Sequence, residues 1–413
     1  MTTAADSERL MHVIASHERG LSDALTIVQQ RFRSGSMPSA MNTVVYGHEE
    51  SVPALTLCFD RRGHLAQVDA GPGLRDGDVE GLVQSLTAPR EERVWASVVF
   101  AYLPTRGTWR YRDVFQILPV PAEAPEPEQL IGDHPFLLEV AYEGHPDPFV
   151  DGRRASITTR EIVRLLAGLV LGPEDRTGHF HRKEWVLESE VDDGQVHLST
   201  RFAQLGYVID DHRPKRESFT APGISTARLR LVEPREYLGS ARGISVESEL
   251  ELPANIELLL DRYFDRGSTD QERFQRWAHW LNHATQVWSL SPSAAHIAVV
   301  QAIEALMPAG AGADRCDACG QPAGPGPTQR FAEFLAEYAP GPAREKARKE
   351  LYALRSSLTH GGKLLSGEIA GPAFHDFTPQ AWDQREMLDV TRTLARIAGV
   401  NWLLAPSIGG SRR

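Results

Sequence analysis

The hydrophobic pattern of this 413-residue chain changes near Pro253, and that change limits the possible folds more than any other feature. Before Pro253, short runs rich in Val, Leu, Phe and Tyr alternate with turn residues, which is typical of β-strands. After Pro253, apolar residues recur every three or four positions, which is typical of amphipathic helices. The sequence therefore predicts an α+β protein. We expect an N-terminal mixed α/β-rich domain over residues 1–250 and a C-terminal all-α helical bundle over residues 251–413.

The first part of the chain mixes helices and strands. Residues 5–32 and 158–171 are predicted to be helical. Two turn sequences, Asp60-Arg-Arg-Gly63 and Asp192-Asp193-Gly194, each predict a hairpin. Strands are expected at residues 42–46, 54–59, 64–68, 94–103, 111–120, 136–142, 184–190 and 195–200. Residues 205–250 lack a clear period and receive no assignment.

Five or six antiparallel helices are expected after Pro253. Ser291 and Pro292 form a helix start, because serine caps a helix N-terminus and proline suits the first helical position. A Gly/Pro-rich segment at 308–327 interrupts the bundle. The helices are predicted at residues 254–264, 269–288, 292–307, 328–339, 341–360 and 379–404.

The charge balance limits the possible partners. A net charge of −11 argues against a chain coated with basic surface for nucleic acid. A local excess exists between Gly341 and Lys363, where six basic residues outnumber two acidic ones. This stretch is either a basic surface or a solvated helix face with Glu/Lys pairs. The basic candidates for RNA binding are Arg344, Arg348, Lys349 and Lys363.

No stretch has the composition of a membrane segment. Residues 162–172 are the longest apolar run, but they include Arg164 and fall short of the ~20 residues that cross a bilayer. Residues 1–20 carry charges throughout, unlike a signal peptide. We therefore expect a cytoplasmic protein with no membrane partner.

The run Leu351-Tyr-Ala-Leu-Arg-Ser-Ser-Leu-Thr-His-Gly-Gly362 carries the main functional candidates, Arg355 and His360. It predicts a helix with a buried leucine stripe that ends at the two glycines. In a regular helix, residues five apart lie about 140° apart around the axis. Only a break after His360 would turn it toward the arginine side or toward a partner chain.

Arginine and histidine suit RNA cleavage without a metal. Histidine serves as acid or base near neutral pH, so it can take the proton of the 2′-hydroxyl or protonate the leaving oxygen. Arginine is always charged and can hydrogen bond to two phosphate oxygens. The alternative is structural, with Arg355 and His360 capping helix carbonyls and pairing with Glu304.

This run resembles the HEPN family, and most closely its Apea-like branch. Tyr352, Arg355, Ser356, His360 and Gly361 match the family context "Tyr-x-x-Arg-Ser-x-x-x-His-Gly". Upstream, the stretch at 296–306 is similar to the apolar helix of the family, and 330–335 is similar to an intermediate helix. The resemblance covers roughly residues 255–405.

The resemblance implies a metal-independent endoribonuclease with an Arg-x4-His motif. Arg355 and His360 of two protomers would form one composite site in a homodimer joined through the HEPN domain. Tyr352, Ser356 and Glu304 would support that site, and cleavage would leave a cyclic phosphate and a 5′-hydroxyl. The resemblance also implies a role in bacterial anti-phage or toxin-type defence, with the N-terminal domain as sensor or substrate selector. The alternative is a noncatalytic HEPN module for dimerisation or nucleotide binding.

Two further features concern charge and metal. Glu304 lies between apolar residues, so it is expected either to pair with Arg355 or to be exposed on the far side of its helix.

Cys316 and Cys319 form half of a zinc site, which would need His283, His296 or a second protomer to complete it. Such a zinc would be structural, because nothing around the pair suggests an activated water, and no cofactor is expected for catalysis. The alternative is a reduced thiol pair in a loop.

Overall fold

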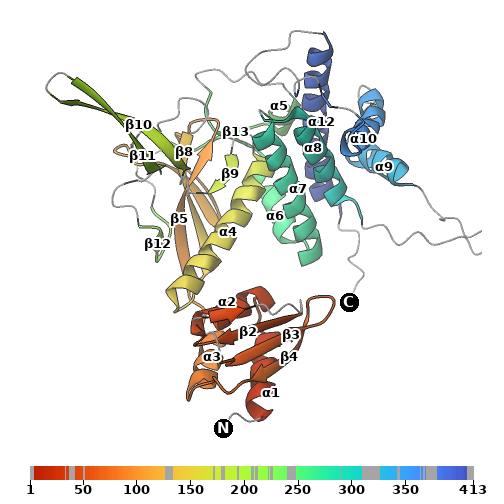
Figure 1. The fold of residues 1–413 in the computed structure, drawn as a ribbon. Coiled ribbons are helices and arrows are strands. Elements are labelled where there is room, and N and C mark those ends of the chain that lie inside the picture. The colour runs from red at the N-terminus through yellow and green to blue at the C-terminus, as the bar shows by residue number, and fades with distance from the viewer. Residues whose placement is uncertain are drawn as a thin grey trace, which may run out of the picture. The chain divides into compact units, whose positions relative to one another are not determined.

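The computed structural model confirms the α+β class: helices and strands both occur before Pro253, and the elements described after it are helices (Figure 1). Among the described residues, no helix combines the length and the apolar composition that a membrane crossing requires. The described residues are 4–406 except 33, 37–41, 50–51, 126–133, 171–172, 178–181, 193–194, 206–208, 210–212, 222, 224–226, 240–247, 289, 309–325, 342–344, 363, 366–367 and 369–378.

The chain forms two compact units. The first comprises residues 1–95, 141–158 and 215–218, and the second comprises 96–140, 159–214 and 219–413. The expected division into domains at residue 250 stays a prediction.

The first unit contains an antiparallel four-stranded sheet in the order β1-β2-β3-β4. The predicted hairpin at Asp60 joins β3 to β4. The predicted helix over 5–32 is two helices, because Gly20 interrupts it with a φ of 83°. The elements are α1 (Ala4–Ala15), α2 (Leu21–Arg31), β1 (Ser34–Ser36), β2 (Thr43–Gly47), β3 (Leu55–Phe59), β4 (Leu65–Ala70) and α3 (Asp78–Leu86), of which β1 and α3 were not predicted.

A six-stranded sheet follows, in which β12, β5, β8, β7 and β6 are neighbours in that order and β9 pairs with β5. The strand predicted over 111–120 is instead a hairpin of β6 and β7, and Arg112 adopts a φ of 47° where it turns. The elements are β5 (Glu92–Ala101), β6 (Trp109–Tyr111), β7 (Phe115–Pro119), β8 (His134–Glu143), α4 (Pro148–Leu169), β9 (Pro173–Thr177) and β12 (Lys215–Arg216).

Two small strand pairs complete the β-structure. The predicted hairpin near Asp192 is present as an antiparallel pair of β10 and β11. The region at 205–250, which received no assignment, contributes β13, which pairs in parallel with β14. The elements are β10 (Arg182–Asp192), β11 (Gln195–Leu205), β13 (Arg230–Val232), α5 (Pro234–Gly239) and β14 (Glu251–Pro253).

The predicted helices after Pro253 are all present. Ser291 caps α8 by accepting a hydrogen bond from the backbone N–H of Ala294, and Pro292 takes the first position, as expected. The elements are α6 (Ile256–Phe264), α7 (Ser268–Val287), α8 (Pro292–Leu306), α9 (Pro327–Tyr338), α10 (Glu345–Thr359) and α12 (Pro379–Leu404).

One hydrophobic core runs through the second unit, and Trp277 of α7 lies fully buried within it. The indole Nε1 donates a hydrogen bond to the carbonyl of Ala395 on α12 at 3.0 Å. A Cβ added to Gly399 would lie 2.2 Å from this ring, and one added to Gly168 of α4 would lie 2.6 Å from it. The two glycines therefore let α12 and α4 pack closely on Trp277. The same core includes strand residues such as Phe136, so sheet and helices stabilise each other.

Candidate active site at the end of α10

The glycines end α10 with a Schellman motif. The backbone N–H of Gly362 donates to the carbonyl of Ser357 at 3.0 Å, and that of Gly361 donates to Leu358 at 3.2 Å. Gly361 has a φ of 71°, the left-handed conformation that glycine adopts without strain. His360 is thus the cap residue, and its N–H still bonds to the carbonyl of Ser356 at 3.1 Å.

One face of α10 anchors the helix in the core. Leu351 and Leu358 are buried, as predicted, while Leu354 is half-buried. Tyr352 packs against Phe331 of α9, with ring centroids 5.1 Å apart. These contacts hold the adjoining face of α10 in a defined orientation.

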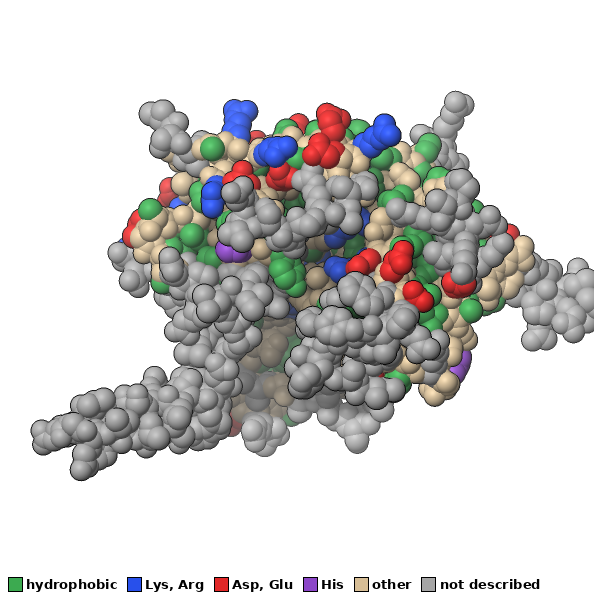
Figure 2. Space-filling model, turned by 90° about the horizontal axis from the view of Figure 1, so that it is seen from above, with side chains coloured by type: hydrophobic (Ala, Val, Ile, Leu, Met, Phe, Trp, Pro, Cys, Tyr) green, Lys and Arg blue, Asp and Glu red, His purple; other side chains and the backbone are tan. Residues whose placement is uncertain are grey.

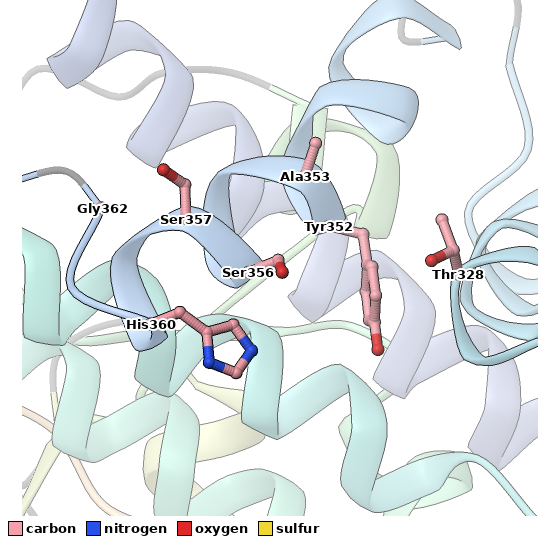
Figure 3. Close-up of a pocket in the computed structure, with 7 residues that line it drawn as sticks. All are labelled: Thr328, Tyr352, Ala353, Ser356, Ser357, His360 and Gly362. Carbon is pink, nitrogen blue, oxygen red and sulfur yellow. The ribbon is translucent and has the colours of Figure 1, made fainter.

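A pocket of about 560 Å³ opens beside the end of α10. Tyr352, Ser356 and His360 line it at positions one helical turn apart, and their side chains point the same way (Figure 3). Thr328 approaches from the first turn of α9 on the opposite side. His360 is exposed, so its imidazole is available to a ligand. The full set of lining residues is Thr328, Tyr352, Ala353, Ser356, Ser357, His360 and Gly362.

Arg355 does not line this pocket. Its Nη2 lies 3.3 Å from Oε2 of Glu304 on α8, so the expected ion pair is present. The guanidinium Cζ lies 5.6 Å from the ring centroid of Tyr352, and Nε is buried without a hydrogen-bond partner. Within one chain, the imidazole of His360 thus lines a pocket together with Tyr352 and Ser356 that Arg355 does not line.

The segment after the glycines is tied to the start of α8. The backbone N–H of Leu365 donates to the hydroxyl of Ser293 at 3.0 Å. The carboxylate of Glu368 accepts from the Ser291 hydroxyl at 2.5 Å and from the Ser293 N–H at 2.9 Å. A carboxylate at a helix N-terminus is favourable because the exposed N–H groups there carry partial positive charge. These bonds restrain the chain that leaves His360.

His296 is a second histidine near α10, but it is buried and has a structural role. It is 1% exposed on α8, and its Nε2 lies 3.5 Å from the carbonyl of Leu351 on α10. Burial lowers the pKa of His296 to about 4, and the contact with Leu351 opposes this only partly. His296 is therefore neutral at pH 7 and belongs to the packing between α8 and α10.

Several predicted site residues lie outside the described part of the structure. These are Arg344, Lys363, Cys316 and Cys319. Arg348 and Lys349 belong to α10, but their side chains are not described. Within the described ranges, no three His, Cys, Asp or Glu side chains are placed to hold a metal ion. The zinc expectation for the cysteine pair stays a prediction.

Acidic and basic side chains are mixed on the described surface. Figure 2 shows Lys and Arg side chains (blue) beside Asp and Glu side chains (red) on the upper face. Among the side chains drawn in colour in this view, the mixture of both signs fits the net charge of −11.

The sequence did not point to Thr328 or Ser357 as pocket residues, nor to Glu368 as a cap. Thr328 follows a proline at the start of α9. That proline predicted the helix, but it did not predict that Thr328 would line a pocket beside α10.

Comparison of the chain with protein-family models, curated proteins and solved structures found no match. The resemblance to the Apea-like HEPN family therefore rests on the residues quoted above.

Proposed function

We propose that this chain is a metal-independent endoribonuclease in which His360 and Arg355 act on the RNA backbone. The observation that carries the proposal is the exposed His360, which caps α10 beside a hydroxyl-lined pocket. An acid–base group at a helix end, open to solvent and next to a pocket, can reach a polymer that lies across the surface.

The reaction needs only proton transfers and charge stabilisation. A histidine takes the proton of the 2′-hydroxyl, and the 2′-oxygen attacks the adjacent phosphorus. The bond from phosphorus to the 5′-oxygen breaks, and a protonated histidine supplies the proton that this oxygen needs. Arginine stabilises the charge on the phosphate oxygens. The products are a 2′,3′-cyclic phosphate and a 5′-hydroxyl.

A composite site formed by two protomers fits the position of Arg355. The motif supplies one histidine per chain, and Arg355 faces Glu304 rather than its own His360. In a homodimer, the motif of each chain would complete that of the other. The helices after Pro253 would then act as the HEPN domain that dimerises. Arg344, Arg348, Lys349 and Lys363 would hold the RNA backbone by charge.

The biological setting follows from the resemblance alone. It would be a cytoplasmic enzyme of anti-phage or toxin-type defence. The N-terminal domain would sense the trigger or select the RNA.

Cleavage of labelled total RNA and tRNA in EDTA tests the proposal. The wild type should cleave and leave cyclic phosphate ends, whereas His360→Ala should lose about 10²–10⁴-fold in rate, the usual contribution of one acid–base group. His134→Ala is the matched control, because His134 is also exposed but lies at the start of β8. Equal cleavage by wild type and His360→Ala contradicts the role of His360.

A noncatalytic nucleotide-binding module is the second candidate. It is favoured by the absence of Arg355 from the pocket and by the hydroxyls of Thr328, Ser356 and Ser357 around it. A pocket of about 560 Å³ is within the usual range for small ligands. Saturable nucleotide binding that His360→Ala weakens, together with wild type that leaves RNA intact, would establish this reading instead.

A further inference from the structure

A second cationic feature lies on α12, away from the α10 pocket. Arg392 and Arg396 are one helical turn apart, so their side chains share one side of the helix. Arg392 Nη2 donates to the hydroxyl of Thr285 on α7 at 2.9 Å. Arg396 Nη1 is buried and has no hydrogen-bond partner. Each of the two residues as a whole remains partly exposed.

The surroundings of the two arginines supply little negative charge. Burial lowers the pKa of Arg396 to about 10, which Tyr237 opposes and the charge of Arg392 reinforces. Burial also lowers the pKa of Arg392, and Asp389 and Tyr102 oppose that shift. Both guanidiniums are still protonated at pH 7. Among the described residues, no carboxylate forms an ion pair with either of them.

Two other buried arginines, Arg154 and Arg266, have partners among the described residues. Arg154 forms two hydrogen bonds with the carboxylate of Asp23. Arg266 donates to three carbonyls at the end of α12, those of Trp402, Leu403 and Ala405. A buried charge without a partner is destabilising, and an unsatisfied buried donor often marks the place of an ion or water. Arg396 differs from these two because its Nη1 has no partner and the nearest charge named beside it is a second cation, Arg392.

We propose that Arg392 and Arg396 form a binding site for a phosphate group, either free phosphate or the phosphate of a nucleotide. A phosphate carries nearly two negative charges near neutral pH, which matches two adjacent guanidiniums. Each guanidinium can donate to two phosphate oxygens, and the hydrogen bond to Thr285 already orients that of Arg392.

This phosphate site is independent of the proposed ribonuclease site. Arg392, Arg396 and Thr285 do not line the pocket at His360, and they lie on α12 and α7 rather than α10. Loss of RNA cleavage therefore leaves the phosphate site standing, and loss of phosphate binding leaves the ribonuclease proposal standing.

Thermal unfolding of the full chain with and without inorganic phosphate tests the site. A ligand that binds only the folded protein raises Tm, by about 2 °C at roughly ten times its Kd. Sodium chloride at matched ionic strength is the control for charge screening. No rise in Tm and no heat of binding in calorimetry at millimolar phosphate would overturn the proposal.

Two variants make the test specific. Arg396→Met should unfold at a higher Tm than the wild type without phosphate, because an unpartnered buried charge is gone, and it should lose the phosphate response. Arg396→Lys keeps the charge but not the two-pronged donor, so its affinity for phosphate should fall. Arg276→Met is the matched control, since Arg276 is exposed on α7 and pairs with Glu272. A phosphate response that persists unchanged in Arg396→Met would overturn the site.

The affinities of adenosine monophosphate and inorganic phosphate then show whether the ligand is a nucleotide or free phosphate. Tighter binding of adenosine monophosphate than of inorganic phosphate assigns the site to a nucleotide. Equal affinities assign it to the phosphate group alone. Either result depends on the same two arginines and disappears in Arg396→Met.

Discussion

The buried Arg154 of the first unit is paired closely with a carboxylate, whereas Arg355 on α10 and Arg396 on α12 of the second unit each keep a buried nitrogen without a hydrogen-bond partner. In the first unit, Arg154 bonds to Asp23 at 3.1 and 2.6 Å, and both side chains are almost fully buried. In the second unit, Arg355 makes a single 3.3 Å contact with Glu304, and Arg396 has a buried nitrogen without a partner. Paired charges stabilise a fold, while charges left without partners are available to a ligand.

The largest expected effect concerns the paired charges. Arg154→Ala removes two hydrogen bonds to the buried carboxylate of Asp23 and should cost about 3–5 kcal/mol of the free energy of unfolding of the first unit. Urea unfolding followed by hydrogen exchange of the first unit measures this cost. Arg62→Ala is the control, because Arg62 lies exposed in the β3–β4 turn and should change stability by less than about 0.5 kcal/mol. A cost below about 1 kcal/mol for Arg154→Ala would show that pairing does not hold this unit together.

The two regions should also respond to acid at different pH. Burial alone would raise the pKa of Asp23, but hydrogen bonds from His17 and Arg154 outweigh it and hold the pKa well below its usual range. The stabilisation that the ionised Asp23 carboxylate gives the first unit is therefore complete above about pH 4 and is lost as the pH falls further. His296 behaves differently, because its folded pKa of about 4 lies below the unfolded value of about 6.5. The second unit should lose stability already between about pH 6.5 and 4, as the unfolded chain takes up the proton first.

Hydrogen exchange at several pH values checks this difference. The helices α8 and α10 should become less protected before the first unit does, by roughly 2–3 kcal/mol near pH 4. His296→Gln cannot titrate, so it should abolish the early loss. Simultaneous loss of protection in both units would contradict the assignment of His296.

A smaller effect is expected at the end of α10. Gly361→Ala places a side chain at a φ of 71° and should cost about 1 kcal/mol. It should lower RNA cleavage more than this cost implies, because the Schellman motif positions the backbone of His360. Gly152→Ala is the control, since a Cβ there has open space and no positive φ. Activity that falls only in step with stability would count against a positioning role.

The smallest expected effect concerns Glu304. Its ion pair with Arg355 is partly exposed, with side chains 29% and 25% exposed, so Glu304→Gln should change stability by less than about 1 kcal/mol. The same variant frees Arg355 to meet phosphate and should shift the KM for RNA. Chemical denaturation and RNA-cleavage kinetics measure the two quantities separately. A stability loss of several kcal/mol in Glu304→Gln would show instead that the Glu304–Arg355 pair stabilises the fold.

Local features of the fold could be predicted from the sequence. The helices after Pro253, the cap at Ser291 and the two hairpins follow from apolar spacing and turn residues. The interruptions at Gly20 and Arg112 could not, because both depend on backbone conformations that the spacing does not reveal. The pairing of Arg154 with Asp23 joins residues far apart in the chain and needed the structure.

The candidate site was predictable in part. The end of α10, the leucine stripe and the pair of Glu304 with Arg355 follow from helical periodicity and the need to compensate a charge. The pocket was not predictable, since Thr328 reaches it from α9 through packing alone. Arg396 was also missed, because an arginine in an amphipathic helix gives no sign that its partner is absent.

The most direct test of the account is to mix two inactive variants, His360→Ala and Arg355→Ala, and to measure RNA cleavage in EDTA. Arg355 does not line the pocket that His360 lines. Each variant removes one kind of group from both halves of the composite site, so each alone should be inactive. Mixed dimers place one intact His360 and one intact Arg355 from different chains in the shared site, so they should recover part of the cleavage, with cyclic phosphate ends, but stay below the wild-type rate because one of the two histidines is missing. Active wild type together with inactive mixed dimers, once tagged subunits confirm that they form, would contradict the composite site.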